Sequence, residues 1–138
     1  MMGWLAATPR PYPGARPENA PKMSRAEQFE RSGTAPAMPP LSTPWFIERL
    51  TEIGIVEPSG MGQGPISWTT LRAWQQLTGT PLAPWEARLL RALSAAFLAA
   101  RNEGEDPLAQ PPFFDQMTVI DPERAELQLR AALLSAAV

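Results

Sequence analysis

Proline is concentrated at the beginning of this chain, and this concentration constrains the fold more than any other feature. Nine of the 17 prolines fall within residues 1–44, in runs such as Pro9-Arg10-Pro11-Tyr12-Pro13. Proline lacks a backbone N–H and fixes φ, so a segment rich in it does not build regular helices or central strands. The sequence therefore predicts an extended or polyproline-like arm over residues 1–43 that does not pack into a core.

One short segment inside this arm has the pattern of a helix. Ser24 and Glu27 form a capping box, which predicts a helix over residues 25–32 that ends at Gly33. Two interpretations of the arm remain open. It is either a disordered tail or an arm that orders on a partner surface. In the second case its anchors are the aromatic residues Trp4, Tyr12 and Phe29.

Helix start and stop signals follow one another after Thr43. Prolines in a first helical turn, a serine N-cap and terminal glycines predict helices over residues 44–53, 68–78, 84–103 and 122–136. The third of these has the most regular apolar stripe, namely Trp85, Leu89, Leu93, Ala96, Phe97 and Ala100. We expect an all-α fold: a helical domain of three to four helices over residues 44–138, preceded by the arm over 1–43.

No strong strand is predicted anywhere in the chain. The run from Met117 to Ile120 leans towards β-structure but is too short to build a sheet, and Phe113-Phe114 is expected to pack back onto the body. The glycines at 60, 62 and 64 do not have the spacing of a dinucleotide fingerprint. A phosphate loop of the Walker type also needs a lysine, and the only lysine is Lys22. We therefore expect a flexible joint between the first two helices of the body.

Composition removes most catalytic chemistry. The chain has no cysteine and no histidine, which excludes disulfides, Ser-His-Asp triads, Cys-His pairs and typical zinc sites. The acidic cluster of Glu103, Glu105 and Asp106 is expected to be a solvated loop. No catalytic residue, cofactor site or metal site is predicted, and we expect a protein that is not an enzyme.

Charge and hydropathy also restrict the partners. Residues 1–43 hold five basic and three acidic residues, a net of +2, and the remainder holds seven and eleven, a net of −4. This balance argues against direct binding of nucleic acid. No apolar run approaches the roughly 18–20 residues of a membrane span, and the first residues lack a signal-peptide layout. We expect no membrane partner and no small-molecule substrate.

The body has four tryptophans near helix starts, and they have two interpretations. As core residues they would bury large areas and fix helix crossings. As surface residues they would anchor a partner helix in a groove. The four candidates are Trp45, Trp68, Trp74 and Trp85.

A series of aromatic and structural motifs resembles a known family. The series is Gly60-Met61-Gly62, Ile66-Ser67-Trp68, Leu71-x-Ala73-Trp74, Leu77-Thr78-Gly79, Pro84-Trp85-Glu86, Leu89-Leu90-x-x-Leu93-Ser94-x-x-Phe97 and Asp106-Pro107. It resembles short proteins encoded in the tail-gene cluster of tailed bacteriophages and prophages, in particular the tail assembly chaperone group. The resemblance covers residues 44–112 and contains no catalytic residue.

The resemblance implies a non-enzymatic role in tail morphogenesis. A tail assembly chaperone would shield the long helical tape measure protein and help to recruit tail tube subunits, in the host cytoplasm during phage assembly. The competing hypothesis is a structural virion component, a minor tail or head–tail connector protein whose arm orders on neighbouring subunits. No individual binding residue is carried over from the family.

Overall fold

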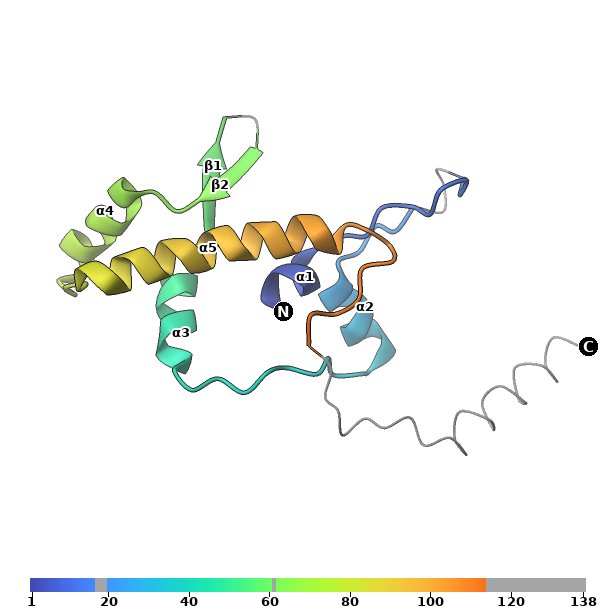
Figure 1. Cartoon of the computed structure of the whole chain (residues 1–138), viewed down its shortest axis with the longest axis horizontal. Coiled ribbons are helices and arrows are strands. Elements are labelled where there is room, and N and C mark those ends of the chain that lie inside the picture. Colours follow the sequence, from blue (N-terminus) through green and yellow to red (C-terminus); the bar gives the residue numbers. More distant parts are fainter. Residues whose placement is uncertain (17–19, 61, 114–138) are drawn as a thin grey trace, which may run out of the picture.

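The computed structural model describes residues 1–16, 20–60 and 62–113. Within these residues the long helix α5 runs through the middle of the molecule, and the other elements gather around it (Figure 1). The predicted helix over 122–136, residue 114 and the run 117–120 lie outside the described residues. The elements are α1 (Met2–Ala6), α2 (Arg25–Ser32), α3 (Pro44–Ile53), β1 (Val56–Ser59), β2 (Gly62–Pro65), α4 (Trp68–Thr78) and α5 (Pro84–Gly104).

Local sequence signals set several helix ends. The Ser24 hydroxyl accepts a hydrogen bond from the backbone N–H of Glu27, and the Glu27 carboxylate accepts one in return from the backbone N–H of Ser24 at 2.6 Å. At α4 the Ser67 hydroxyl accepts from the backbone N–H of Thr70. Gly79 ends α4 in the left-handed conformation at φ +67°, which glycine adopts without steric cost.

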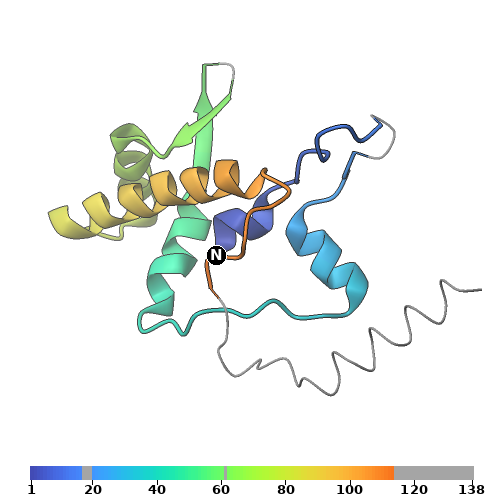
Figure 2. The same cartoon turned by 45° about the vertical axis from the view of Figure 1, so that its right-hand side comes forward.

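The fold is predominantly helical but not all-α. β1 and β2 form an antiparallel hairpin in which Val56 pairs with Pro65 and Ser59 pairs with Gly62. Two residues therefore connect the strands, and the first of them, Gly60, has a φ of +57°, as the tight turns of two-residue hairpins require. The expected flexible joint is instead a hairpin that projects from the body (Figure 2).

The prolines explain why the hairpin escapes sequence-based prediction. Pro58 and Pro65 lie inside the strands, where proline ordinarily argues against a strand. In a two-stranded sheet, however, each strand has an outer edge without a partner. A proline whose nitrogen points towards that outer edge removes no hydrogen bond between the two strands. The prolines also leave fewer edge donors for another chain to pair with.

A compact core joins α3, the end of the hairpin, α4 and the first half of α5. Ile66, Leu71 and Leu90 are almost completely buried, and Phe46 and Leu50 of α3 pack against them. Burial of aliphatic side chains of this size contributes roughly 1.5–3 kcal/mol each. The helical body is therefore held together by contacts between elements that follow one another in the chain.

The prediction that the start of the chain is extended and unpacked is wrong for residues 2–7. α1 packs along the second half of α5, with Trp4 only 6% exposed and Ala7 fully buried. A Cβ added at Gly3 would collide with the backbone oxygen of Phe97, so the absence of a side chain permits this close approach. The first proline is Pro9, and the apolar residues before it are free to form a helix.

After α5 the chain turns back and forms hydrogen bonds with α1 and with the start of α2. Trp4 Nε1 donates to the backbone oxygen of Ala109 at 3.3 Å. Arg25, at the start of α2, donates through Nε to the oxygen of Gly104 and through Nη2 to that of Asp106. Both views show this return of the chain past α1 (Figures 1 and 2). No helix in the described part of the chain has the length and apolar character needed to cross a membrane.

Candidate partner-binding surface

A buried serine connects the hairpin to α5. The Ser94 hydroxyl donates to the backbone oxygen of Ile55 at 2.6 Å and accepts from the backbone N–H of Ile66 at 2.9 Å. Ser94 is fully buried, so both hydrogen bonds are shielded from water. One side chain therefore satisfies the residue before β1 and the residue after β2, which fixes the hairpin on the helix.

A glutamate of β1 organises the start of α4. One Glu57 carboxylate oxygen accepts from the Thr70 hydroxyl at 2.6 Å and from the backbone N–H of Ser67 at 3.0 Å. These hydrogen bonds, that of Thr70 first, lower the pKa of Glu57 below its ordinary value. The carboxylate thus joins the hairpin to α4 and has no feature of an acid–base catalyst.

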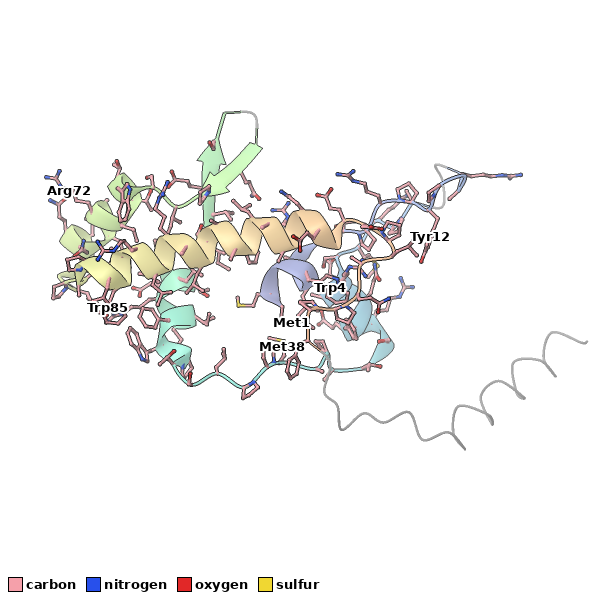
Figure 3. All side chains as sticks on the ribbon, viewed as in Figure 1. Met1, Trp4, Tyr12, Met38, Arg72 and Trp85 are labelled. Carbon is pink, nitrogen blue, oxygen red and sulfur yellow. The ribbon has the colours of Figure 1, made fainter. Side chains whose placement is uncertain are left out.

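An apolar hollow lies between α1, α3 and α5, and we call it the apolar groove. It has a volume of about 220 Å³. Figure 3 labels Met1 and Met38, which lie beside it. The groove is lined by Met1, Met2, Gly3, Met38, Pro39, Leu41, Ile47, Leu50, Leu93, Ala96, Phe97 and Ala100.

The lining of the groove has no charged side chain. α5 contributes four apolar residues, α3 contributes Ile47 and Leu50, and α1 contributes its first two residues together with Met1. Met38 and Leu41 at its border are 47% and 55% exposed. Methionine side chains are flexible and polarizable, so they adapt to apolar surfaces of different shape. This surface is therefore apolar and adaptable in shape.

An exposed apolar stripe on α5 leads towards the groove. Trp85 is 54% exposed and Leu89 is 36% exposed, and Ala92 and Ala96 follow at the next two turns of the same face. Ala96 also lines the groove. The spacing of i, i+4, i+7 and i+11 is that of one side of a helix. The stripe and the groove therefore form a continuous apolar surface, about 16 Å long between residues 85 and 96.

The structure brings Trp45 and Trp85 together at the α3 end of the molecule. Both flank Phe46, whose ring lies 3.8 Å from that of Trp45 and 5.7 Å, edge-on, from that of Trp85. The Arg49 guanidinium lies 4.8 Å above the Trp45 ring and pairs with Glu86 at 3.2 Å. The two tryptophans cover the core on one side and remain partly open to solvent on the other.

The other two candidate tryptophans of the body lie on α4. Trp68 is 53% exposed, with the Arg91 guanidinium 5.4 Å from its ring centre. Trp74 is half-buried, and its Nε1 has no hydrogen-bond partner among the described residues. Trp68 and Trp74 are not part of the lining of the apolar groove.

The aromatic residues of the arm differ from one another. Trp4 is buried against its own chain, with Phe29 at 6.4 Å and the Arg25 guanidinium at 4.3 Å from its ring. Tyr12 is 58% exposed. Trp4 and Phe29 thus hold α1 and α2 together, whereas Tyr12 is open to solvent.

Sequence reasoning missed the groove because its walls come from aliphatic residues far apart in the chain. Met1, Met38 and Ile47 have no motif in common. Two signals could have indicated it. One signal is the apolar run before Pro9. The other is the apolar stripe on α5, which is longer than the part needed to pack against the other predicted helices.

The fold and this surface define a class of small, predominantly helical proteins with an apolar groove on the surface. Among the described residues no group of acidic side chains could hold a metal ion. Residues 51–99 match the protein family described as phage tail assembly chaperone, which confirms the resemblance that the sequence motifs indicate. The match supports a role in phage tail assembly and an interaction with phage tail proteins. No curated protein and no solved structure matches the chain.

The matched segment contains the structural centre of the body. It spans the end of α3, the hairpin, α4 and most of α5, and it includes the Ser94 hydrogen bonds. Part of the floor of the apolar groove lies within it, at Leu93, Ala96 and Phe97. The walls contributed by α1, by residues 38–41 and by Ile47 and Leu50 of α3 lie outside.

Proposed function

We propose that this chain is a non-enzymatic tail assembly chaperone that binds helical segments of the tape measure protein, of tail tube subunits or of both. The observation that carries the proposal is the apolar groove, whose lining has no charged side chain and whose border is exposed. An amphipathic helix places its apolar face into such a groove through side chains spaced at i, i+3, i+4 and i+7. Binding shields that face from water and from aggregation.

The stripe on α5 extends the contact and gives it a direction. A helix lying along α5 would contact Trp85 and Leu89 at one end and enter the groove at Ala96. Trp85 would then be the aromatic anchor of this surface, since large aromatic side chains supply much of the energy of interfaces. Trp45, Trp68, Trp74 and Tyr12 remain candidate contacts around it.

Charges beside the groove favour a partner with a basic flank. A second hollow, on α3, shares Leu41 and Ile47 with the groove and is also lined by Glu48 and Glu52. These carboxylates would pair with lysine or arginine residues that follow the apolar face of the bound helix. Such pairs set the orientation of the partner more than its affinity.

The alternative of a structural virion component depends on an arm that orders on neighbouring subunits. In the structure α1 finds its binding site on α5 of the same chain, with Trp4 buried there. Order at the start of the chain therefore does not require a neighbouring subunit. The chaperone function is the better supported of the two.

Co-expression with the tape measure protein and pull-down tests the proposal. The variant Ala96→Asp places a carboxylate in the groove, and Ala95→Asp places the same group on an exposed position of α5 outside it. We expect loss of the tape measure protein from the first pull-down and its retention in the second. Equal retention would show that the groove is not the binding site. Mass spectrometry of purified particles separates the two functions, since a virion component is present there in stoichiometric amounts.

A further inference from the structure

We propose that the exposed face of α5 binds the same face of a second copy of this chain, with the two helices antiparallel. The pairing needs no tail protein and does not rest on the proposed function. Three observations lead to it: opposite charges at the two ends of the face, small residues at its centre, and a hollow that lies opposite an exposed tryptophan.

One face of α5 has no cover within the described part of the chain. In Figure 1 the helix is visible along its whole length, with no described element drawn across it. Exposed residues recur on this face every three or four positions, which is the spacing of one side of a helix. They include Trp85, Arg88, Ala92, Ala96, Ala99 and Glu103.

The two charged residues of this face have opposite signs and lie at its opposite ends. Arg88 and Glu103 are exposed, and neither side chain has a hydrogen-bond or ion-pair partner among the described residues. Each lies about 11 Å along the helix from the midpoint between Ala95 and Ala96. A two-fold axis through that midpoint places Arg88 of each copy opposite Glu103 of the other. The same ion pair then forms twice, as in any isologous contact.

The centre of the face allows a close approach of the two helices. The two-fold axis places Ala92 of one copy opposite Ala99 of the other, and Ala95 opposite Ala96. With side chains of this size, helix axes can approach to about 8 Å, the lower end of the usual range. The alanines alone would fit many helices. The charges at the two ends select a second copy of this chain as the occupant.

A hollow at the end of α5 provides a binding place for Trp85 of the second copy. The hollow has a volume of about 640 Å³, and its lining includes Glu103, Asp106, Pro107 and Leu108. The two-fold axis places Trp85 of the other copy opposite residue 106. Trp85 is 54% exposed in the single chain, so its ring is available for this contact. Proline and leucine offer the ring an apolar wall, and the carboxylates can accept from its N–H.

The pair is weak and reversible. A contact formed mainly by one helix from each copy lies at the low end of the interface sizes seen between proteins. We expect a dissociation constant on the order of 100 µM. At lower protein concentrations the chain is therefore a monomer, and the stripe on α5 is free for a tail protein.

Charge reversal in the full chain tests the pairing. The measurement is sedimentation equilibrium at protein concentrations up to about 1 mM. Arg88→Glu and Glu103→Arg each place like charges opposite one another at both ends of the contact, and each should weaken self-association at least tenfold. Arg72→Glu on α4 and Glu30→Arg on α2 are the matched controls at exposed positions outside this face, and both should associate like the wild type.

Two combinations distinguish the antiparallel pair from a general effect of charge. A chain that carries both Arg88→Glu and Glu103→Arg should associate again, since the opposite charges have only changed places. An equimolar mixture of the two single variants should also associate, because unlike chains then have opposite charges at both ends. Restoration also shows that the single variants are folded.

The contact of Trp85 has its own test. Trp85→Ala should weaken self-association at least fivefold, because it removes the aromatic anchor from both hollows. Leu77→Ala, at an 87% exposed position of α4, should leave it unchanged. Equal association of the two variants would overturn the placement of Trp85 in the hollow.

Three results would overturn the pairing as a whole. They are a wild-type chain that is monomeric at every concentration, association that both single charge reversals leave unchanged, and loss of association that neither the double variant nor the mixture restores. No tail protein enters these measurements. Pairing without any effect of Ala96→Asp on tape measure binding would leave the pair intact and contradict the chaperone groove, and groove-dependent binding by a strictly monomeric chain would do the reverse.

Discussion

The buried hydroxyl of Ser94 accepts a hydrogen bond from the backbone N–H of Ile66 at 2.9 Å. Ile66 is itself almost fully buried and belongs to the core. The return of the chain from the hairpin to α4 is therefore fixed on α5 by the hydrogen bond to Ser94 and by the packing of Ile66 in the core. Together with the hydrogen bond from Ser94 to the backbone oxygen of Ile55, that hydrogen bond fixes both ends of the hairpin on α5.

The variant Ser94→Ala should lower the free energy of unfolding strongly, although it removes only one non-hydrogen atom. It leaves the backbone oxygen of Ile55 and the backbone N–H of Ile66 buried without their partner. A buried polar group without a partner costs roughly 1–3 kcal/mol. Urea unfolding should show this loss, whereas Thr69→Ala at an exposed position of α4 should change the free energy of unfolding by less than about 0.5 kcal/mol. Equal stabilities of the two variants would contradict the role of Ser94.

The variant Gly3→Ala should detach α1 from α5. The added methyl group would collide with the backbone oxygen of Phe97, which cannot rotate away as a side chain could. Overpacking of this kind costs roughly 1–3 kcal/mol. Hydrogen exchange of the amides in residues 2–7 should become roughly tenfold faster or more, while that of the core is unchanged. Gly62→Ala, at a position with open space, is the matched control.

Acid should weaken the link between the hairpin and α4. The pKa of Glu57 is lowered in the folded protein, so its stabilising effect is complete above the ordinary carboxyl pKa of about 4.3. It is lost as the pH falls through the lower, folded-state pKa. Urea unfolding between pH 7 and pH 3 should show a smaller loss of stability for Glu57→Gln than for the wild type. Thr69→Ala, which removes a side chain without a titrating group at an exposed position of α4, should follow the wild-type curve.

The variant Trp85→Ala should weaken tape measure binding while the protein remains folded. Trp85 is more than half exposed, so its removal costs mainly the edge contact with Phe46, roughly 0.5–1.5 kcal/mol of stability. As an anchor at the end of the stripe it should contribute at least about 1 kcal/mol to binding, a fivefold loss or more. Leu77→Ala removes an equally apolar side chain, 87% exposed on α4, and should leave binding unchanged. Similar affinities of the two variants would argue against the stripe.

The helix ends were the easiest features to predict, because each depends on a few adjacent residues. The capping box of Ser24 and Glu27 is present, and so is the left-handed glycine at 79. The hairpin was missed because its strands carry two prolines and few β-branched residues. Its position depends instead on Ser94, whose hydrogen-bond partners lie 28 and 39 residues away in the chain.

The candidate site was only partly predictable. The apolar stripe of α5 is visible as a period in the sequence, and Trp85 was recognised as a candidate anchor. Whether such a stripe is buried or exposed depends on which elements cover it, and here α1 and α3 leave a gap between them. The docking of Trp4 onto α5 could not be read from proline content, since it depends on the missing side chain of Gly3.

The central claim is that the apolar groove binds a tail protein helix. The most direct measurement is a calorimetric titration of the purified chain with the tape measure protein, for the wild type, Ala96→Asp and Ala95→Asp. Burial of an unpaired carboxylate costs several kcal/mol, so Ala96→Asp should weaken binding at least tenfold. Ala95→Asp should bind within about twofold of the wild type, with unchanged unfolding curves for both variants. Equal affinity of all three proteins would contradict the claim.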